Sequence, residues 1–224
     1  MLEKLRITGL GGWGEDPLWE RIYDWTVEHP TTGGALWKVG IGSDLRRLYA
    51  AAAEIGRQPA GSSVLDVPCG GGVALRGLRP GQGVRYVAAD ISQAMLDRTM
   101  AAARERQVAA QVEPLIADVG ALPFADGEFD LVVSFTGLHC FPDPQLAIAE
   151  MGRVLRSGGV LTGSALLNDT GIRYLPMRQV GRFAGLIGPS ATTPEVREWL
   201  EAAGFEGVAV TLSGALAYFR ATMG

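Results

Sequence analysis

The sequence of 224 residues contains little cysteine and little histidine, with two of each. Two cysteines are too few for the disulfide framework that stabilises small secreted domains. The first ten residues include Glu3, Lys4 and Arg6 and no long apolar run, so no signal peptide is predicted. No stretch approaches the ~18 uninterrupted apolar residues of a membrane-spanning helix. We therefore expect a cytoplasmic protein with no integral membrane segment.

The chain also lacks a cluster of basic residues. Its 20 Lys and Arg against 24 Asp and Glu give a net charge of −4, which disfavours nucleic acid as the main partner. The length predicts a single domain with room for a small cap. A domain of this size buries about 70% of its unfolded surface, so it requires neither a metal nor a disulfide for stability. The sequence leaves the oligomeric state open.

The most informative stretch is residues 63–72, Ser-Val-Leu-Asp-Val-Pro-Cys-Gly-Gly-Gly. The apolar run from Val64 to Val67 predicts a buried strand. The three glycines that follow allow a sharp turn and a close approach of the backbone to a ligand, and residues 73–77 suggest a helix. A strand, a glycine loop and a helix predict the first βα unit of a doubly wound sheet, whose ligands bind beyond the carboxyl ends of the strands.

An acidic residue ends each of three successive predicted strands. Asp66 lies in the first strand, Asp90 follows residues 84–89, and Asp118 follows residues 112–117. A carboxylate after the second strand can accept hydrogen bonds from both ribose hydroxyls, and it repels a 2′-phosphate. Asp90 could instead be an acid beside a helix, and Asp118 a turn former. Three such acids together favour a nucleotide-binding site.

The glycine loop distinguishes two classes of nucleotide-binding protein. The dinucleotide fingerprint G-x-G-x-x-G needs a third glycine at position 75, which is leucine. The stretch instead resembles motif I, D-x-G-x-G-x-G, of the class I S-adenosylmethionine (SAM)-dependent methyltransferases. The matching residues are Asp66, Gly70 and Gly72. Pro68 replaces the first glycine, which is compatible only if that position needs neither a positive φ nor an N–H donor.

Later stretches extend this resemblance over residues 62–167. Residues 117–124 resemble the methyltransferase stretch that reads adenine through an acid and the next backbone N–H. Residues 129–134, the loop with His139, a helix over 143–155 and the stretch 155–161 resemble motifs IV to VI, most closely those of the type 11, ubiquinone- and menaquinone-type enzymes.

The resemblance implies a fold and a cofactor. The fold is an α/β, Rossmann-like seven-stranded sheet with an N-terminal helical cap, whose last strand enters antiparallel through a hairpin. Strands over 208–212 and 215–222 would form that hairpin. The implied cofactor is S-adenosyl-L-methionine.

The resemblance also implies the site residues. His139 is the candidate general base, because an unperturbed histidine pKa near ~6.5 leaves it neutral and basic at physiological pH; the alternative is that it orients its loop or packs under a lid. The cofactor-binding candidates are Tyr23, Asp66, Pro68, Cys69, Gly70, Asp90, Ile91, Met95, Asp118, Val119 and Phe135. No metal ligands are expected.

The cysteines allow a separate prediction. Cys69 follows the first strand and Cys140 follows the fourth. These strands are neighbours in the usual order of such sheets, so we expect two free thiols flanking one cleft.

We predict one domain over residues 1–224, divided into a helical cap (1–61), a SAM-binding core (62–167), a lid (168–191) and a last helix with the hairpin (192–224). Within the cap we expect a helix from Asp16 to about Val27, a loop over 31–34 and a helix over 44–55. Four of the five tryptophans fall in the cap, which indicates either an aromatic cover over a cavity or ordinary packing; they are Trp13, Trp19, Trp25 and Trp37.

The predicted lid contains three arginines, Arg173, Arg178 and Arg182. They could hold an anionic group of a substrate or touch a membrane surface, or they could form a solvated helix face.

The predicted function is SAM-dependent methyl transfer to a small apolar or amphipathic acceptor, with O-methylation slightly favoured over C-methylation. A quinone-like or isoprenoid acceptor fits this prediction. The alternatives are a nicotinamide-dependent oxidoreductase and a non-catalytic SAM-binding module. A nucleic-acid substrate is disfavoured further because no Asn-Pro-Pro-Tyr-like tetrad follows the fourth strand.

Overall fold

The computed structural model describes residues 26, 29, 31–183 and 185–224. The predictions for Tyr23, for the first three tryptophans of the cap and for nearly all of the helix over 16–27 lie outside these residues.

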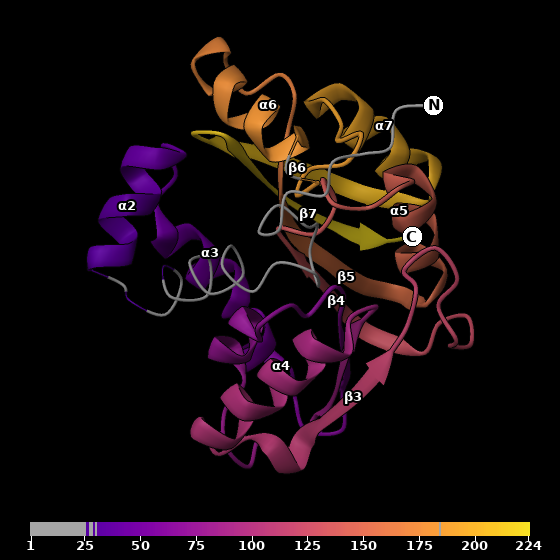
Figure 1. Ribbon diagram of the computed structural model, residues 1–224. Coiled ribbons are helices and arrows are strands. Elements are labelled where there is room, and N and C mark those ends of the chain that lie inside the picture. The colour runs from indigo at the N-terminus through magenta and orange to yellow at the C-terminus, as the bar shows by residue number, and fades with distance from the viewer. Residues whose placement is uncertain (1–25, 27–28, 30, 184) are drawn as a thin grey trace, which may run out of the picture.

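A seven-stranded sheet with the order β3-β2-β1-β4-β5-β7-β6 forms the centre of the molecule (Figure 1). Strands β1 to β5 pair in parallel, and β7 pairs antiparallel with both β5 and β6. This confirms the predicted doubly wound α/β sheet with an antiparallel hairpin at its end. The strands are β1 (Ser63–Asp66), β2 (Arg85–Asp90), β3 (Val112–Ile116), β4 (Phe129–Phe135), β5 (Leu155–Leu166), β6 (Phe205–Ser213) and β7 (Leu216–Met223).

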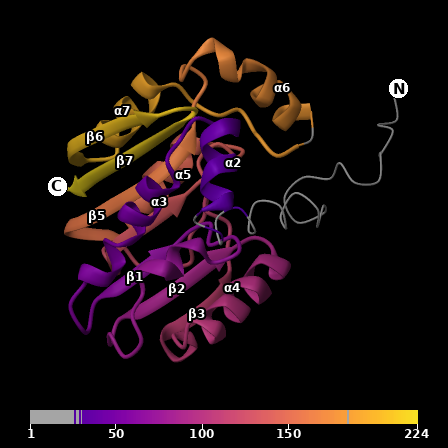
Figure 2. The ribbon, with the colours of Figure 1, turned by 90° about the vertical axis from the view of Figure 1, so that its left-hand side faces the viewer.

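Helices cover both faces of the sheet (Figure 2). The described α-helices are α2 (Thr32–Gly40), α3 (Leu45–Ala52), α4 (Gln93–Glu105), α5 (Pro144–Arg153), α6 (Leu175–Phe183) and α7 (Thr193–Ala202). Short 3₁₀ helices are η1 (Ile55–Arg57), η2 (Val73–Gly77), η3 (Ala109–Gln111) and η4 (Ile172–Tyr174). Helices α2, α3 and α4 contribute to one apolar core, and α5 and α7 contribute to the other. The central strands β1, β2 and β4 are therefore buried on both faces, which explains their apolar runs.

Several helices begin where the sequence predicts. Asp143 caps α5 by accepting from the Leu146 N–H at 2.9 Å, and Pro144 occupies the first turn. Thr192 and Glu195 form a capping box at the start of α7. Ser92 occupies the predicted cap position of α4, but its side chain makes no cap bond.

One local prediction is wrong. Residues 31–34 were expected to form a loop, yet α2 begins at Thr32. Gly33 in this helix is buried, and a Cβ at this position would collide with the Thr26 carbonyl. Glycine disfavours helix but is required here by the close contact with the Thr26 backbone. The helix predicted over residues 73–77 is present as the 3₁₀ helix η2.

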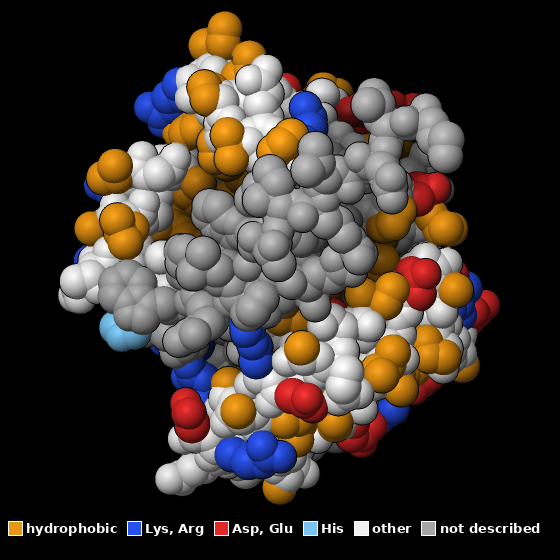
Figure 3. All heavy atoms as spheres, viewed as in Figure 1, with side chains coloured by type: hydrophobic (Ala, Val, Ile, Leu, Met, Phe, Trp, Pro, Cys, Tyr) orange, Lys and Arg blue, Asp and Glu red, His pale blue; other side chains and the backbone are white. Residues whose placement is uncertain are grey.

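The predicted lid segment contains η4 and α6, and α6 buries an arginine. Arg178 is 5% exposed. Its guanidinium donates to the Leu167 carbonyl at 3.3 Å and to the Gly171 carbonyl at 3.2 Å. The alternative of a solvated helix face is therefore wrong for Arg178. Its side chain instead fixes the loop that precedes α6. Apolar side chains such as Ile172 and Phe183 are exposed instead, and Figure 3 shows apolar surface over α6.

Among the described residues, no helix combines the length and apolar character needed to cross a bilayer.

A glycine in the middle of the sheet offers a test of the packing. A Cβ on Gly163 in β5 would collide with the Ser134 carbonyl of β4 and with the Phe219 ring of β7. We expect Gly163→Ala to lower the free energy of unfolding by about 1–3 kcal/mol, because the core would be overpacked. Gly34→Ala in α2 is the control, since no atom lies within 4 Å of its Cβ position. It should be neutral or stabilise by up to about 1 kcal/mol. Urea unfolding measures both; equal effects would contradict the described packing.

Candidate cofactor and active site

A cavity of about 390 Å³ opens at the carboxyl ends of β1, β2 and β4. Its volume lies within the range of about 300–1,000 Å³ that is typical of small-molecule sites. The structure brings together nine predicted cofactor residues in its lining. They are Pro68, Cys69, Gly70, Asp90, Ile91, Met95, Asp118, Val119 and Phe135. Their direct contact with a cofactor stays a prediction.

Asp90 joins the first two βα turns. One carboxylate oxygen accepts from the Gly70 N–H at 3.0 Å, and the other accepts from the Ser92 N–H at 2.9 Å. Asp90 is 6% exposed and lines the cavity. A carboxylate is a type of group that can accept hydrogen bonds from vicinal hydroxyls. Ile91, which follows it, is 73% exposed at the cavity.

The glycine loop adopts the conformation that its glycines allow. Gly70 and Gly72 have φ values of 51° and 86°, in the left-handed region that other residues avoid. The Thr99 hydroxyl of α4 donates to the Gly70 carbonyl at 2.7 Å. The loop is thus fixed from the helix side by Thr99 and from the sheet side by Asp90.

Pro68, the departure from motif I, lies in the cavity wall after a cis Val67–Pro68 bond. Its ring packs so closely on Gly137 that a Cβ there would collide with the Pro68 Cδ atom. The proline therefore fits a site where the first loop and the loop after β4 touch.

Asp118 follows β3, which is separated in the sheet by β2 and β1 from β4, the strand that ends at Phe135. Its Oδ1 atom accepts from the Gly120 N–H at 2.9 Å. Asp118 itself is exposed, while Val119 is buried against the core. An exposed carboxylate beside a fixed backbone segment can accept from an exocyclic amine.

Asp66 does not line the cavity. It is 1% exposed, and its Oδ2 atom accepts from the Tyr86 hydroxyl at 2.6 Å. Burial raises the pKa of Asp66 from 3.8 to about 8, although the Tyr86 hydrogen bond opposes the shift. The motif I acid is therefore a buried group behind the glycine loop, and its predicted contact with the cofactor is not supported by this placement.

His139 does not line the cavity either. It is 4% exposed, and its Nδ1 atom accepts from the Leu166 N–H at 3.2 Å. Burial lowers the pKa of His139 from 6.5 to about 4. Its carbonyl also accepts from the Gly188 N–H at 2.8 Å. His139 thus ties its loop to the end of β5 and to the segment after α6.

The two cysteines are free and both line the cavity, as predicted. Cys69 is buried, and burial raises the pKa of its thiol well above the usual range. Cys140 is half-buried.

The cavity lining also includes residues that are not among the candidates predicted from the sequence. They are Thr136, Phe141, Pro142 and Gly185. Thr136 has a φ of 54°, which is unusual for a β-branched residue and marks a constrained position. Gly185 comes from the segment after α6, and no local pattern could place it there. Among the described residues, no group of three or more His, Cys, Asp and Glu is arranged to hold a metal ion.

The structure thus combines a Rossmann-like sheet with a cavity that has acids at the end of β2 and after β3. Residues 65–162 match the family described as Methyltransferase domain. This stretch of the chain is similar to methyltransferase domains, which supports S-adenosylmethionine as the cofactor. The carboxylates of Asp90 and Asp118, the open glycine loop and the apolar walls fit that cofactor.

Curated relatives are similar over part of their length. An uncharacterized chloroplastic methyltransferase of Arabidopsis thaliana is 31% identical over 134 residues, which are 56% of this chain and 38% of the relative. A demethylmenaquinone methyltransferase of Thermus thermophilus is 36% identical over 124 residues, 55% of each chain. The chain thus spans less than two thirds of the length of these relatives.

A solved structure shares the fold. A SAM-dependent methyltransferase of Thermotoga maritima, described as a possible histamine N-methyltransferase, superposes with a TM-score of 0.62 at 20% identity. The match covers 92% of this chain and 98% of that one. The family match favours methyl transfer over a nicotinamide-dependent oxidoreductase.

Thiol alkylation tests the cavity. We expect S-adenosylhomocysteine to slow the labelling of both Cys69 and Cys140 by iodoacetamide, because both thiols line the cofactor cavity. Without ligand, Cys69 should react more slowly, because burial raises its pKa and the thiolate is the reactive form. Mass spectrometry of each peptide over time measures the rates, with urea-unfolded protein as the control. Labelling rates that are the same with and without S-adenosylhomocysteine would contradict the placement of both thiols at the cofactor cavity.

Asp66 predicts a pH dependence of stability. Because its pKa is about 8 in the folded protein and 3.8 ordinarily, the folded state keeps a proton that the unfolded chain has released. The free energy of unfolding should therefore fall as pH rises between these values. His139, with a pKa lowered to about 4, acts in the opposite direction but only below pH 6.5. Between pH 6.5 and 8, Asp66→Asn should flatten the decline, because asparagine stays neutral and can accept from Tyr86.

Urea unfolding at several pH values in that interval measures the effect. Asp97→Asn is the matched control, since Asp97 is exposed on α4. If the wild-type protein and Asp66→Asn show parallel profiles, Asp66 is not the buried acid described above.

Proposed function

We propose that the protein is an enzyme that transfers a methyl group from SAM to a small apolar or amphipathic acceptor. The observation that carries this proposal is one cavity lined by both acids and apolar side chains. Asp90 and Asp118 lie at the end of β2 and after β3, and Phe135, Phe141 and Pro142 lie at the end of β4 and after it. An apolar lining beside a nucleotide site favours a small apolar molecule over a charged polymer.

The residues have distinct proposed roles. Asp90 would accept from the ribose hydroxyls, and Asp118 with the Val119 N–H would read adenine. Gly70 and Cys69 would line the cofactor along the glycine loop. When bound, SAM supplies an electrophilic methyl group on a positively charged sulfur. Phe135 and Phe141 would exclude water and hold the acceptor nucleophile near the reacting carbon, which is the main catalytic contribution required.

We propose a positioning role for His139 in place of the general-base role. Its Nδ1 atom is occupied by the Leu166 N–H, and burial holds it neutral. The other histidine, His29, is exposed. The titratable side chains in the described cavity lining are Cys69, Asp90, Asp118 and Cys140. This favours acceptors that ionise readily, such as phenols, quinols and activated carbon acids, and leaves O-methylation slightly ahead of C-methylation.

The relatives are consistent with such acceptors. Besides the demethylmenaquinone methyltransferase, they include a protein of Aspergillus sclerotiorum named as an O-methyltransferase. We also infer that residues 62–167 carry the cofactor, that 168–191 act as a lid, and that 192–224 complete the sheet, with 1–61 as a helical cap. Gly185 at the cavity supports the lid. Two plant relatives are named as chloroplastic, and a cytoplasmic location stays a prediction for this chain.

A methyl-transfer assay tests the proposed function. Purified protein is incubated with SAM labelled on its methyl group and a panel of phenols, quinols and sugars. We expect label in a phenol or quinol product, inhibited by S-adenosylhomocysteine. SAM binding without transfer to any acceptor would support the non-catalytic module instead. Binding of NADH without binding of SAM would reopen the oxidoreductase alternative.

Two substitutions separate the roles of His139. His139→Asn keeps an acceptor for the Leu166 N–H, whereas His139→Leu removes it and leaves a buried donor unsatisfied. For a positioning role, we expect His139→Asn to retain most of the turnover and His139→Leu to lose both turnover and cofactor affinity. A general base contributes about 10²–10⁴-fold. Loss of that size in both variants, with unchanged affinity for SAM, would restore His139 as the base.

A further inference from the structure

The segment between β3 and β4 carries the proposed adenine reader and has no regular secondary structure across residues 117–128. Asp118 and Val119 lie at its start. An irregular loop can place a carboxylate accurately only if other parts of the fold fix its backbone. The neighbouring helix α5 supplies these contacts.

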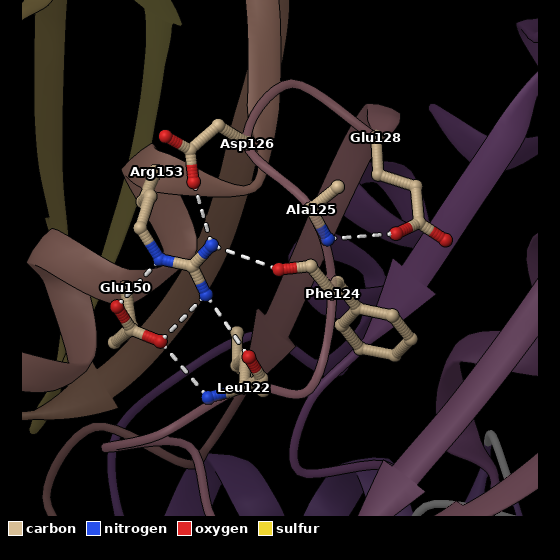
Figure 4. Close-up of polar contacts among 7 residues, drawn as sticks. All are labelled: Leu122, Phe124, Ala125, Asp126, Glu128, Glu150 and Arg153. Atoms are coloured by element: carbon tan, nitrogen blue, oxygen red, sulfur yellow. Dashed lines mark hydrogen bonds and ion pairs between the residues drawn. The ribbon is translucent and has the colours of Figure 1, made fainter.

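Arg153, in the last turn of α5, holds the backbone of this loop (Figure 4). Its guanidinium donates to the Leu122 carbonyl at 2.9 Å and to the Phe124 carbonyl at 2.8 Å. It also donates to the Asp126 carboxylate at 2.8 Å, and twice to Glu150 at 2.7 and 2.9 Å. A guanidinium has five N–H donors, so every donor of Arg153 is used.

Glu150 holds the same loop together with Arg153, and we call these two residues the clamp. It lies one turn before Arg153 on the same side of α5, and the two form a bidentate pair. The Glu150 Oε2 atom also accepts from the Leu122 N–H at 2.9 Å. The hydrogen bond from Arg153 lowers the pKa of Glu150, which keeps the carboxylate charged. The N–H and the carbonyl of Leu122 are therefore both held by one ion pair.

The clamped residues are close to Asp118 along the chain. Only three residues separate Asp118 from Leu122, and the side chain of Leu122 is buried in the core. Gly120, between them, packs against α5: a Cβ there would lie 3.3 Å from the Leu146 side chain and 3.4 Å from Asp118 Oδ1. The turn at Asp118 thus rests on α5 at one end and is anchored by Leu122 at the other.

We propose that Glu150 and Arg153 are positioning residues that set the selectivity of the site for adenine, through the backbone of residues 117–126. This inference rests on the proposed role of Asp118. A surface ion pair alone contributes little to stability. The clamp differs because the charged groups bond to backbone atoms of a loop that carries a ligand-reading carboxylate. Lysine cannot replace Arg153, since it lacks the planar fork that reaches two carbonyls and two carboxylates together.

The test measures a ratio of affinities rather than activity. S-adenosylhomocysteine and S-inosylhomocysteine differ at the purine position where adenine has an amine and hypoxanthine has a carbonyl. Calorimetry gives both dissociation constants for the wild-type protein, Arg153→Lys and Glu150→Gln. We expect both variants to lose at least about threefold of the preference for adenine, because a displaced Asp118 loses part of one charge-assisted hydrogen bond. A merely structural defect would weaken both ligands equally and leave the ratio unchanged.

Arg156→Lys is the matched control. Arg156 pairs with Asp130 at 2.6 Å on the neighbouring strands and makes no described contact with residues 117–126. Its variant should keep the wild-type ratio. Thermal unfolding of each variant verifies that the protein is folded at the temperature of the titration.

Asp118→Asn distinguishes the two proposals. If it leaves the ratio unchanged, Asp118 is not the adenine reader, and the inference fails together with that part of the proposed function. If Asp118→Asn lowers the ratio while Arg153→Lys and Glu150→Gln do not, Asp118 reads adenine but the proposed positioning role of the clamp is wrong. A ratio lowered by all three variants and unchanged in Arg156→Lys supports the clamp.

Discussion

The site depends on one carboxylate, that of Asp90, because it joins two turns that come from different βα units. Its two oxygens accept from the N–H groups of Gly70 and Ser92, so the glycine loop after β1 and the start of α4 after β2 are fixed to each other. Both N–H groups would be costly to leave unpaired where water is largely excluded. The same carboxylate also lines the cavity. The arrangement of the two turns and the proposed binding of the ribose hydroxyls therefore both depend on the Asp90 carboxylate.

The buried pair of Asp66 and Tyr86 illustrates a different use of an acid. Asp66 lies behind the glycine loop, and its single described hydrogen-bond partner among side chains is the Tyr86 hydroxyl. Burial favours the neutral acid. Asp66 and Asp90 both end a strand, but they differ in role because Asp66 faces the core and Asp90 faces the cavity. The sequence pattern predicts the same role, cofactor binding, for both.

Much of the fold could be predicted from the sequence, because its signals are local. Apolar runs predicted the central parallel strands, and the Asp143-Pro144 pair predicted the start of α5. The acids after β2 and β3 line the cavity for the same reason, since parallel strands place their carboxyl ends at one edge. Gly33 and His139 could not be placed in this way. Gly33 lies against the Thr26 backbone, and His139 bonds to Leu166 and Gly188. Such tertiary contacts leave no periodic signal in the sequence.

Calorimetric titration of wild-type protein and Asp90→Ala with S-adenosylhomocysteine and NADH tests the central claim most directly. Asp97→Ala, an exposed change on α4, is the control. The account predicts that wild-type protein and Asp97→Ala bind S-adenosylhomocysteine and not NADH, and that Asp90→Ala loses this binding while it remains folded. Undiminished binding of S-adenosylhomocysteine to Asp90→Ala, or binding of NADH to the wild-type protein, would contradict the assignment of Asp90 and of the cavity.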